Sequence, residues 1–210
     1  MKKLSLRAVM ALALGTCVLP LSFVDGAEPA ASPVAIQSGK ATLSPENTHL
    51  QFVCAHRRAD KPDPRTGTFA KFTGEAEVDA AAKSLKSLNV DIDTNSVSTE
   101  FGKLTTHLKS QDFFDTREHP KASFKSTKVT AGAKPGECTI TGDLTLHGVT
   151  KSIKAPATVT FTDGGFTLNS KFAIDRSEFG MTFGAENVEN TVSLTVIVGQ
   201  KNKVLANAGN

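Results

Sequence analysis

Three side chains with metal-ligating atoms lie close together early in the chain. Cys54 and His56 are two residues apart and share one side of an extended strand, whereas nearby His49 has the opposite parity. A structural zinc site uses four protein ligands, and a blue-copper site uses two His, a Cys and usually a Met. The sequence around Cys54 offers no Met and no second Cys. We therefore expect no bound metal.

A second group, His107, Ser110 and Asp112, has the residue types of an acid–base and nucleophile set. On a helix His107 and Ser110 are neighbours at i and i+3, but Asp112 at i+5 points elsewhere. His147 and Asp143 offer another acid–base pair. The sequence has no P-loop, no dinucleotide-binding glycine pattern and no zinc-protease motif. We therefore predict a protein that is not an enzyme and uses no cofactor.

The composition favours a globular protein with an apolar interior. The chain has 210 residues, a formal net charge of +3, 39% hydrophobic residues and 21% charged residues. These values are typical of globular proteins, and the charge is too small for a nucleic-acid-binding surface. The chain has 13 Phe but no Trp and no Tyr. Its aromatic rings therefore bring no ring hydrogen-bond donor into the interior.

The first 26 residues have the pattern of a signal peptide. Basic residues lie within 1–7, and an uncharged stretch over 8–24 follows, interrupted by Gly and Pro. We predict cleavage after Gly26 and a periplasmic or secreted protein. Two alternatives are a retained N-terminal anchor and a lipoprotein modified at Cys17, for which the preceding Thr16 is a poor fit.

Most of the remaining chain alternates polar and apolar residues, as at Leu88, Val90 and Ile92. About eight or nine such strands follow one another with short connections, and 57–67 is predicted to be a polar loop because it contains two prolines. Helical spacing over 99–115 predicts a helical segment in two short pieces, capped by Ser98 or Thr99. Antiparallel strands of this kind close into a barrel or split into a sandwich.

Three parts are predicted after the signal peptide. An Ala-, Pro- and Ser-rich linker covers 27–39, a single β domain covers 40–200, and a C-terminal tail covers 201–210. Cys54 and Cys138 both fall on apolar sides of predicted strands. In an oxidising compartment they either form a disulfide or remain buried free thiols.

Four stretches, in this order, resemble motifs of the YceI-like family of exported lipocalin-like proteins. Residues 67–74 match its G-x-F-x-x-F-x-G strand, and residues 105–126 match its H-L-x-S-x-D-F-F-D block followed by P-x-A-x-F-x-S. Residues 141–151 match its G-D-L-T-x-H-G-V-T-K signature, and residues 175–181 match its R-x-x-F-G pattern. The resemblance covers nearly the whole chain after the signal peptide.

The resemblance implies an all-β fold: an eight-stranded antiparallel lipocalin-like barrel with a short helical segment capping one end. It also implies an apolar lumen that in some members holds a polyisoprenoid or quinone-like lipid, and it implies that a homodimer can form. For each residue proposed to line the lumen, the alternative is ordinary barrel core. The proposed lining residues are Phe52, Val90, Ile92, Leu108, Phe113, Phe114, Phe124, Leu144, Phe161, Phe172, Val192, Leu194 and Val196.

Two residues are candidates for contacting a lipid head group. Arg176 lies where a strand ends and can meet an anionic or carbonyl head group, or it can form a salt bridge with Asp175 or Glu178. His107 is the second candidate, at the rim. We therefore predict an exported protein that binds a long apolar lipid for transport, storage or stress protection and does not bind nucleic acid. The alternatives are an enzyme acting on an isoprenoid lipid and a structural or stress module without a ligand.

Overall fold

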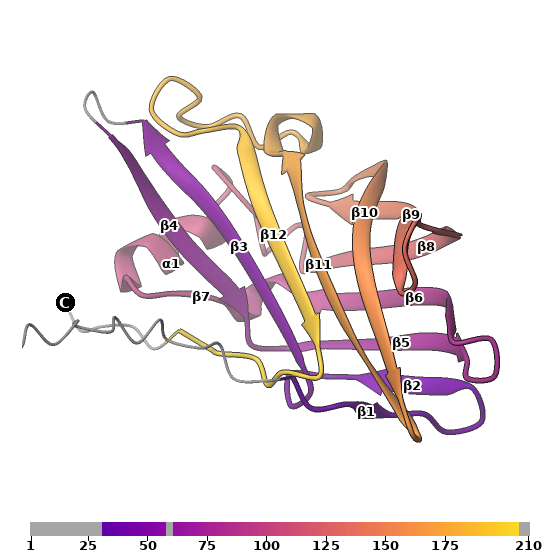
Figure 1. Ribbon diagram of the computed structural model, residues 1–210. Helices are drawn as coiled ribbons and strands as arrows, with labels where there is room; N and C mark the ends of the chain where they lie inside the picture. Colours follow the sequence, from indigo (N-terminus) through magenta and orange to yellow (C-terminus); the bar gives the residue numbers. More distant parts are fainter. Residues whose placement is uncertain (1–30, 58–60, 206–210) are drawn as a thin grey trace, which may run out of the picture.

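The computed structural model describes residues 31–57 and 61–205. Within them the chain forms twelve strands, one α-helix and two 3-10 turns (Figure 1). The strands are β1 Val34–Ala35, β2 Lys40–Leu43, β3 Thr48–Arg57, β4 Pro62–Phe69, β5 Phe72–Asp79, β6 Ser84–Asp93, β7 Val97–Thr99, β8 Lys121–Ala131, β9 Glu137–Leu146, β10 Val149–Thr162, β11 Gly165–Asp175 and β12 Thr191–Val198. The helix is α1 Gly102–Lys109, and the 3-10 turns are η1 Thr94–Ser96 and η2 Arg176–Phe179.

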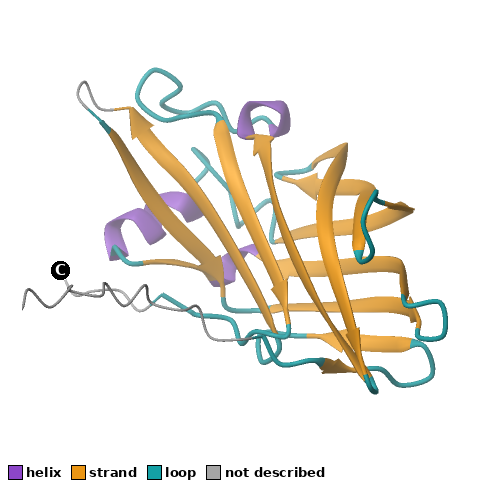
Figure 2. Cartoon of the chain, viewed as in Figure 1, coloured by secondary structure: helices purple, strands orange, loops and turns teal. Residues whose placement is uncertain are grey.

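All twelve strands belong to one strongly curled antiparallel sheet (Figure 2). Neighbouring strands follow the order β2-β5-β6-β8-β9-β10-β11-β12-β3-β4-β7, and β1 adds to β11. The two ends of this path are joined through the chain itself, because β4 runs into β5 and β6 runs into β7. This curled, lipocalin-like sheet confirms the predicted fold class.

The strand count differs from the predicted eight because three long strands are each divided into two pieces. β2 and β3 are separated by a turn at Ser44–Asn47, where Pro45 cannot donate a ladder hydrogen bond. β6 and β7 are separated by η1, whose first turn is capped by the Asp93 side chain accepting from the Asn95 N–H at 3.0 Å. Joining these pairs, and joining β4 to β5, restores eight long strands beside the short β1.

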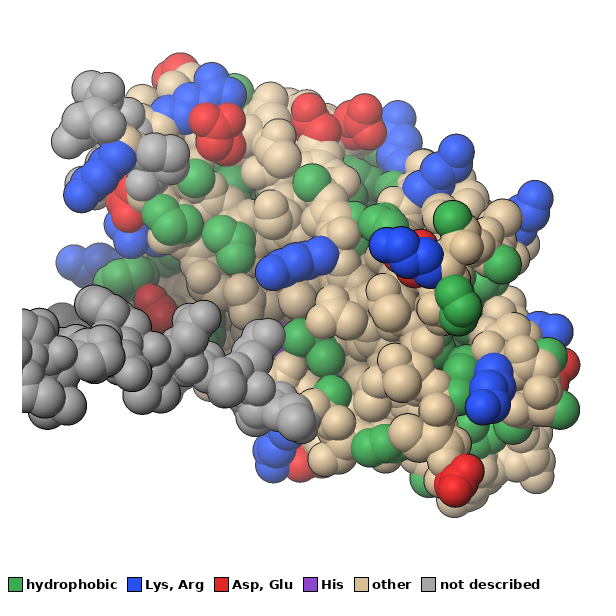
Figure 3. Space-filling model, viewed as in Figure 1, with side chains coloured by type: hydrophobic (Ala, Val, Ile, Leu, Met, Phe, Trp, Pro, Cys, Tyr) green, Lys and Arg blue, Asp and Glu red, His purple; other side chains and the backbone are tan. Residues whose placement is uncertain are grey.

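The interior side of the sheet is apolar because the alternation of side chains places every second residue inside. In β10, Ala155, Ala157 and Val159 are buried and the residues between them are exposed. On the outer face shown in Figure 3, charged side chains of both signs are scattered, with small groups of hydrophobic side chains between them. At one end the core is solid, with Phe166 and Val198 at 0% exposure.

Helix α1 is shorter than the predicted helical segment 99–115. It has no side-chain cap, because the Thr99 hydroxyl accepts from the Phe101 N–H at 3.2 Å and bonds to the Thr105 hydroxyl. It ends at Lys109, and tight turns follow to Pro120. Leu108 and Phe114, from the helix and these turns, pack against the sheet residues Phe52 and Phe69.

The folded domain extends beyond both of its predicted boundaries, 40 and 200. The predicted linker 27–39 includes β1, where buried Val34 pairs with Phe166. Beyond the predicted boundary at 200, Asn202 is 6% exposed and donates to the Phe69 carbonyl at 2.7 Å. The predicted signal peptide, with its cleavage site and Cys17, lies outside the described residues. Among the described residues no helix is long and apolar enough to span a membrane.

The predicted loop 57–67 is wrong over its second half. β4 begins at Pro62 and pairs with β3 from Arg57↔Pro62 to Gln51↔Thr68. Prolines fit here because β7 covers the other side of β4 only at Gly67–Phe69. The Pro64 nitrogen, which has no proton to donate, therefore lies on an edge strand.

Candidate functional site

The curled sheet encloses a cavity of about 210 Å³ beneath α1 and the turns that follow it. Its walls come from β3, β4, β6, β8, β9, β10, β11 and β12, with further residues from β7, α1 and the chain around Arg176. All but one of the thirteen predicted lining residues border it: Phe52, Val90, Ile92, Leu108, Phe113, Phe114, Phe124, Leu144, Phe172, Val192, Leu194 and Val196.

Phe161 is the exception and does not border the cavity. It has the inward parity of β10, but it lies near the hairpin end of that strand, where the core is solid. It pairs with Phe166 across β10 and β11, and the two rings stack with centroids 6.0 Å apart. Phe161 is therefore a core residue, the alternative that the sequence left open.

Several cavity residues were missed by the sequence analysis. Leu50 lies on the inward side of β3 with Phe52, Leu88 lies on that of β6 with Val90, and Ala155 lies on that of β10 with Ala157. These residues could have been predicted from strand parity, because each lies two positions from another inward residue of its strand. The full additional apolar set is Leu50, Phe69, Leu88, Leu104, Ala122, Ile140, Leu146, Ile153, Ala155, Ile174, Met181 and Val188.

Three rings form the junction between the sheet and the cap. The centroids of Phe52 and Phe69 lie 5.6 Å apart, and those of Phe114 lie 5.9 Å and 5.5 Å from them. The Phe114 ring meets both partners edge to face, which is a favourable arrangement for aromatic pairs. These rings therefore pack the core and border the cavity at the same time.

Arg176 is the most buried charged group on the cavity wall, at 3% exposure. Its guanidinium donates to three main-chain oxygens: Glu189 at 3.0 Å, Met181 at 2.7 Å and Val188 at 3.4 Å. The alternative of a salt bridge with Asp175 or Glu178 is not formed in the described structure. Asp175 instead accepts from the Ser177 hydroxyl at 2.5 Å and from the Ser177 N–H at 2.8 Å, and these two hydrogen bonds lower the pKa of its carboxyl.

The chain segment 180–190, which Arg176 holds, lies beside the end of β3 (Figure 1). The Arg57 N–H donates to the Asn187 oxygen at 2.8 Å, and the Glu189 N–H donates to the Ala55 oxygen at 2.9 Å. In Figure 1 this segment, η2 and α1 lie away from the hairpin of β10 and β11. They contribute Leu104, Leu108, Arg176, Met181 and Val188 to the cavity wall, and we call this end the mouth of the cavity.

His107 lies outside the cavity lining and forms a pair that the helical-wheel argument did not expect. Its Nε2 is 2.9 Å from Asp112 Oδ2, because α1 ends at Lys109 and the chain then turns back. The Ser110 hydroxyl donates to the main-chain oxygen of His107 at 2.8 Å and is not aligned with the imidazole. The ring of His107 contacts Phe113 and Phe183, at centroid distances of 4.9 and 5.2 Å.

Cys54 and Cys138 are both free thiols, so the disulfide alternative is wrong for this structure. Cys54 Sγ donates to the Glu189 oxygen at 3.2 Å, whereas Cys138 packs against the solid core cluster at the other end. Burial raises the pKa of both thiols, and Arg176 partly opposes this at Cys54. His49 is 3.0 Å from the Asn202 side-chain oxygen and takes no part in a cluster with Cys54.

These features define a lipocalin-like β protein: a curled antiparallel sheet around an apolar cavity, closed at one end and capped at the other. The chain belongs to the YceI-like family, whose domain model matches residues 42–199. The resemblance stated from the four motifs is thereby confirmed.

Relatives and solved structures support the assignment. A UPF0312 protein of Pseudomonas savastanoi pv. phaseolicola is 36% identical over 154 residues, covering 72% of each chain. BcnA of Burkholderia cenocepacia has a similar fold, with a TM-score of 0.61 and 23% identity over 71% of this chain and 94% of BcnA. A polyisoprenoid binding domain from Saccharophagus degradans matches with a TM-score of 0.56 and 16% identity, covering 75% and 95% of the two chains. At these identities the two structures support the fold alone.

Proposed function

We propose that this protein is an exported carrier that holds a long apolar lipid, a polyisoprenoid or a quinone with an isoprenoid tail, in the cavity of its sheet. The observation that carries the proposal is the cavity wall, which is built mainly from Phe, Leu, Ile and Val on eight strands and the cap. Transport, storage or stress protection are the uses that fit a sequestered lipid. The solved polyisoprenoid binding domain shares this fold, and its description is the reason for choosing this ligand class.

The physical chemistry favours an isoprenoid over a polar ligand. Burial of apolar surface contributes about 25 cal/mol per Å², and a chain of isoprene units offers almost nothing else. A polar ligand would need several hydrogen-bonding partners inside the cavity, whereas most of the residues that line it are apolar. The absence of Trp and Tyr in the sequence fits a wall with few ring donors.

The size of the cavity implies that the cap moves when a long chain binds. Ligand pockets commonly measure roughly 300–1,000 Å³, whereas this cavity measures about 210 Å³. Phe113 and Phe114 border the cavity from the turns after α1, so displacement of these turns lengthens the space toward the mouth. We expect lipid binding to change hydrogen exchange in this segment more than in β10 and β11.

Arg176 is the favoured contact for a lipid head group. A guanidinium carries five N–H donors, and the three hydrogen bonds at Arg176 leave two of them for a phosphate or carbonyl oxygen. The tail then points toward the solid core around Phe166. His107 lies outside the lining and contacts only a head group that protrudes from the mouth.

An enzyme acting on an isoprenoid lipid is the second candidate, and the His107–Asp112 pair is the observation that favours it. Such an enzyme needs an acid–base pair facing the bound chain. Within the described residues the titratable groups on the cavity wall are Cys54, His56, Arg65 and Arg176, and the His107 pair is not among them. Binding without chemistry therefore accounts for the geometry better. The alternative of a module without a ligand requires a cavity that admits no chain.

Native mass spectrometry with lipid extraction tests the proposal. The whole chain is purified from cells that export it, and ubiquinone-8 and a polyprenol are added to a delipidated sample. We expect one lipid per chain, and this outcome also reports the oligomeric state, including the homodimer that the family resemblance implies. A chain that emerges empty and takes up neither added lipid contradicts the proposal. Mass analysis of the exported protein checks removal of residues 1–26.

A further inference from the structure

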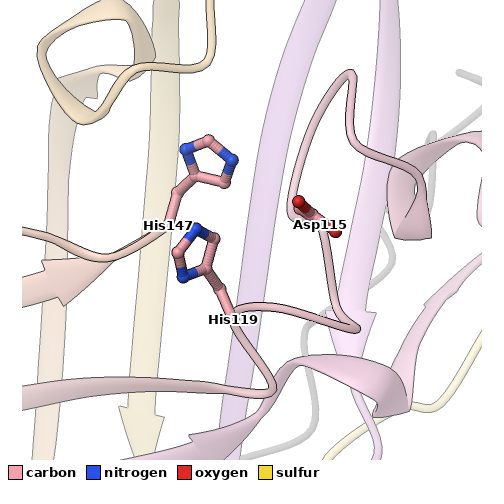
Figure 4. Close-up of side chains that lie close together, drawn as sticks. All are labelled: Asp115, His119 and His147. Carbon is pink, nitrogen blue, oxygen red and sulfur yellow. The ribbon is translucent and has the colours of Figure 1, made fainter.

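Asp115, His119 and His147 form a cluster that lipid binding does not use (Figure 4). Their potential ligand atoms, one carboxylate oxygen and two imidazole nitrogens, all lie within 4.8 Å of one another. Asp115 and His119 come from the turns after α1, and His147 comes from the hairpin between β9 and β10. All three side chains are half-buried, so the cluster is close to solvent.

The backbone places Asp115 and His119 on one side of a single helical turn. The His119 N–H donates to the Asp115 oxygen at 2.8 Å, so the two residues stand at i and i+4 across that turn. Asp115 has a positive φ of 41°, which only a few non-glycine residues adopt without strain. In Figure 4 the carboxylate of Asp115 faces the two imidazole rings.

His147 occupies a position where a turn would ordinarily select Asn, Asp or Gly. It forms the two-residue hairpin turn with Gly148, with φ values of 50° and 74°, and Leu146 pairs with Val149 across it. The His119 ring packs against this turn so closely that a Cβ on Gly148 would lie 2.7 Å from its Cε1. The two imidazole centroids are 4.7 Å apart.

The hydrogen bond of His147 sets which nitrogen is free. Its Nδ1 lies 3.1 Å from the main-chain oxygen of Phe179, and a carbonyl can only accept. Nδ1 therefore carries the proton, and Nε2 presents a lone pair. Metal-bound histidines characteristically donate their other ring N–H to such a carbonyl, which fixes the tautomer and the ring orientation.

We propose that Asp115, His119 and His147 bind a first-row divalent cation of the Zn²⁺ type. Two imidazole nitrogens and a carboxylate are a common three-ligand set for such ions and leave a fourth position for water. Metal–ligand bonds of about 2.0–2.1 Å require the ligand atoms to come within roughly 3.3 Å of each other in a tetrahedral site. Rotation of the half-buried side chains supplies this approach.

A metal ion at this site would connect two segments that border the cavity. Asp115 directly follows Phe114, and His147 directly follows Leu146, and both of these preceding residues border the cavity. A bound ion therefore joins the cap to the β9–β10 hairpin across the cavity mouth. This role is separate from lipid binding, which depends on the apolar wall.

The test is equilibrium dialysis of the whole chain against Zn²⁺, in comparison with variants at the three positions. Asp115→Asn and His147→Asn keep residue types that tolerate positive φ, so the turns are preserved, and His119→Ala removes the third ligand. We expect one Zn²⁺ per unmodified chain and at least a tenfold weaker affinity in each variant. His56→Ala and His107→Ala are the controls and retain the affinity, because neither residue belongs to the cluster.

The ¹⁵N resonances of the histidines provide a readout that does not depend on affinity. Addition of Zn²⁺ shifts the Nε2 resonance of His147 and a ring nitrogen of His119, and leaves that of His56 unchanged. The proposal is overturned if the unmodified chain binds no Zn²⁺, or if folded His119→Ala and His147→Asn chains bind it with unchanged affinity. Far-ultraviolet circular dichroism establishes that the variants are folded.

Discussion

Arg176 Nη1 donates to the main-chain oxygen of Met181 at 2.7 Å, which places a buried guanidinium in a largely apolar wall. Two further carbonyls, from Val188 and Glu189, accept from the same guanidinium, which also lies 6.0 Å from the centroid of the Phe113 ring. The charge is thus solvated by main-chain dipoles in place of water or a carboxylate. The residue holds the 180–190 segment at the cavity mouth and keeps donors available there.

Replacement of Arg176 tests this arrangement. Arg176→Met leaves three carbonyl oxygens without their donor, and we expect a loss of about 2–4 kcal/mol in the free energy of unfolding, measured in urea. Arg57→Met is the control, since the Arg57–Glu189 ion pair is 47% and 42% exposed and contributes under about 1 kcal/mol. Equal losses in the two variants would show that the hydrogen bonds from Arg176 to the carbonyls stabilise the fold no more than an exposed ion pair does.

Filling the cavity separates binding from folding. Ala155 borders the cavity at 5% exposure, and Ala155→Phe projects a ring into it. We expect the amount of copurified lipid to fall at least tenfold, while the fold is retained because the ring enters existing space. Lys154→Phe, one residue earlier on the exposed side of β10, keeps the lipid. Unchanged lipid content in Ala155→Phe would move the ligand out of this cavity.

The ring of Phe52 packs against the backbone of Gly67 and leaves no room for a side chain there. A Cβ at Gly67 would lie 2.1 Å from Phe52 Cζ, so Gly67→Ala forces the ring to move and is expected to cost about 1–3 kcal/mol. Phe52→Leu removes the obstructing atoms. In a double-mutant cycle followed by urea unfolding, the combined loss is therefore smaller than the sum of the single losses. Additive losses would argue against the contact.

Asn202 fixes the end of the domain to the sheet. Its amide donates to the Phe69 oxygen at 2.7 Å and accepts from the Leu50 N–H at 3.2 Å. Asn202→Ala leaves buried groups unsatisfied, so we expect the free energy of unfolding, measured by thermal denaturation, to fall by about 1–3 kcal/mol. Lys201→Ala is the neighbouring control and changes nothing measurable, since its ion pair with Glu46 is exposed. Equal free energies of unfolding in Asn202→Ala and Lys201→Ala would show that residues after 200 do not stabilise the domain.

The two thiols should react slowly. Burial raises the pKa of Cys54 and Cys138 above the ordinary value of 9.0, so little thiolate forms at neutral pH. In a Cys17→Ser chain, iodoacetamide labelling should therefore be slower in the folded state than in urea. Because the unfolded chain ionises these thiols first, the free energy of unfolding declines as the pH rises above about 9. Fast labelling of the folded protein near neutral pH would contradict the burial.

The sequence predicted the features that depend on local periodicity. Alternation located the strands and, through parity, the inward residues Phe52, Val90 and Leu194, because side-chain direction follows directly from residue spacing. The helical wheel placed Asp112 away from His107, which was wrong because the helix ends before Asp112. Contacts between distant segments, such as His119 with His147, depend on how the sheet curls and have no local signal.

The solid end of the sheet sets how this interior selects its contents. Phe166, Leu168 and Val198 are fully buried there and leave no exit, so a chain enters only from the capped end. Inside the cavity few hydrogen-bond donors are available to discriminate between lipids by their polar groups. A channel that is closed at one end therefore selects lipids by the length of the chain that fits more than by their chemical identity.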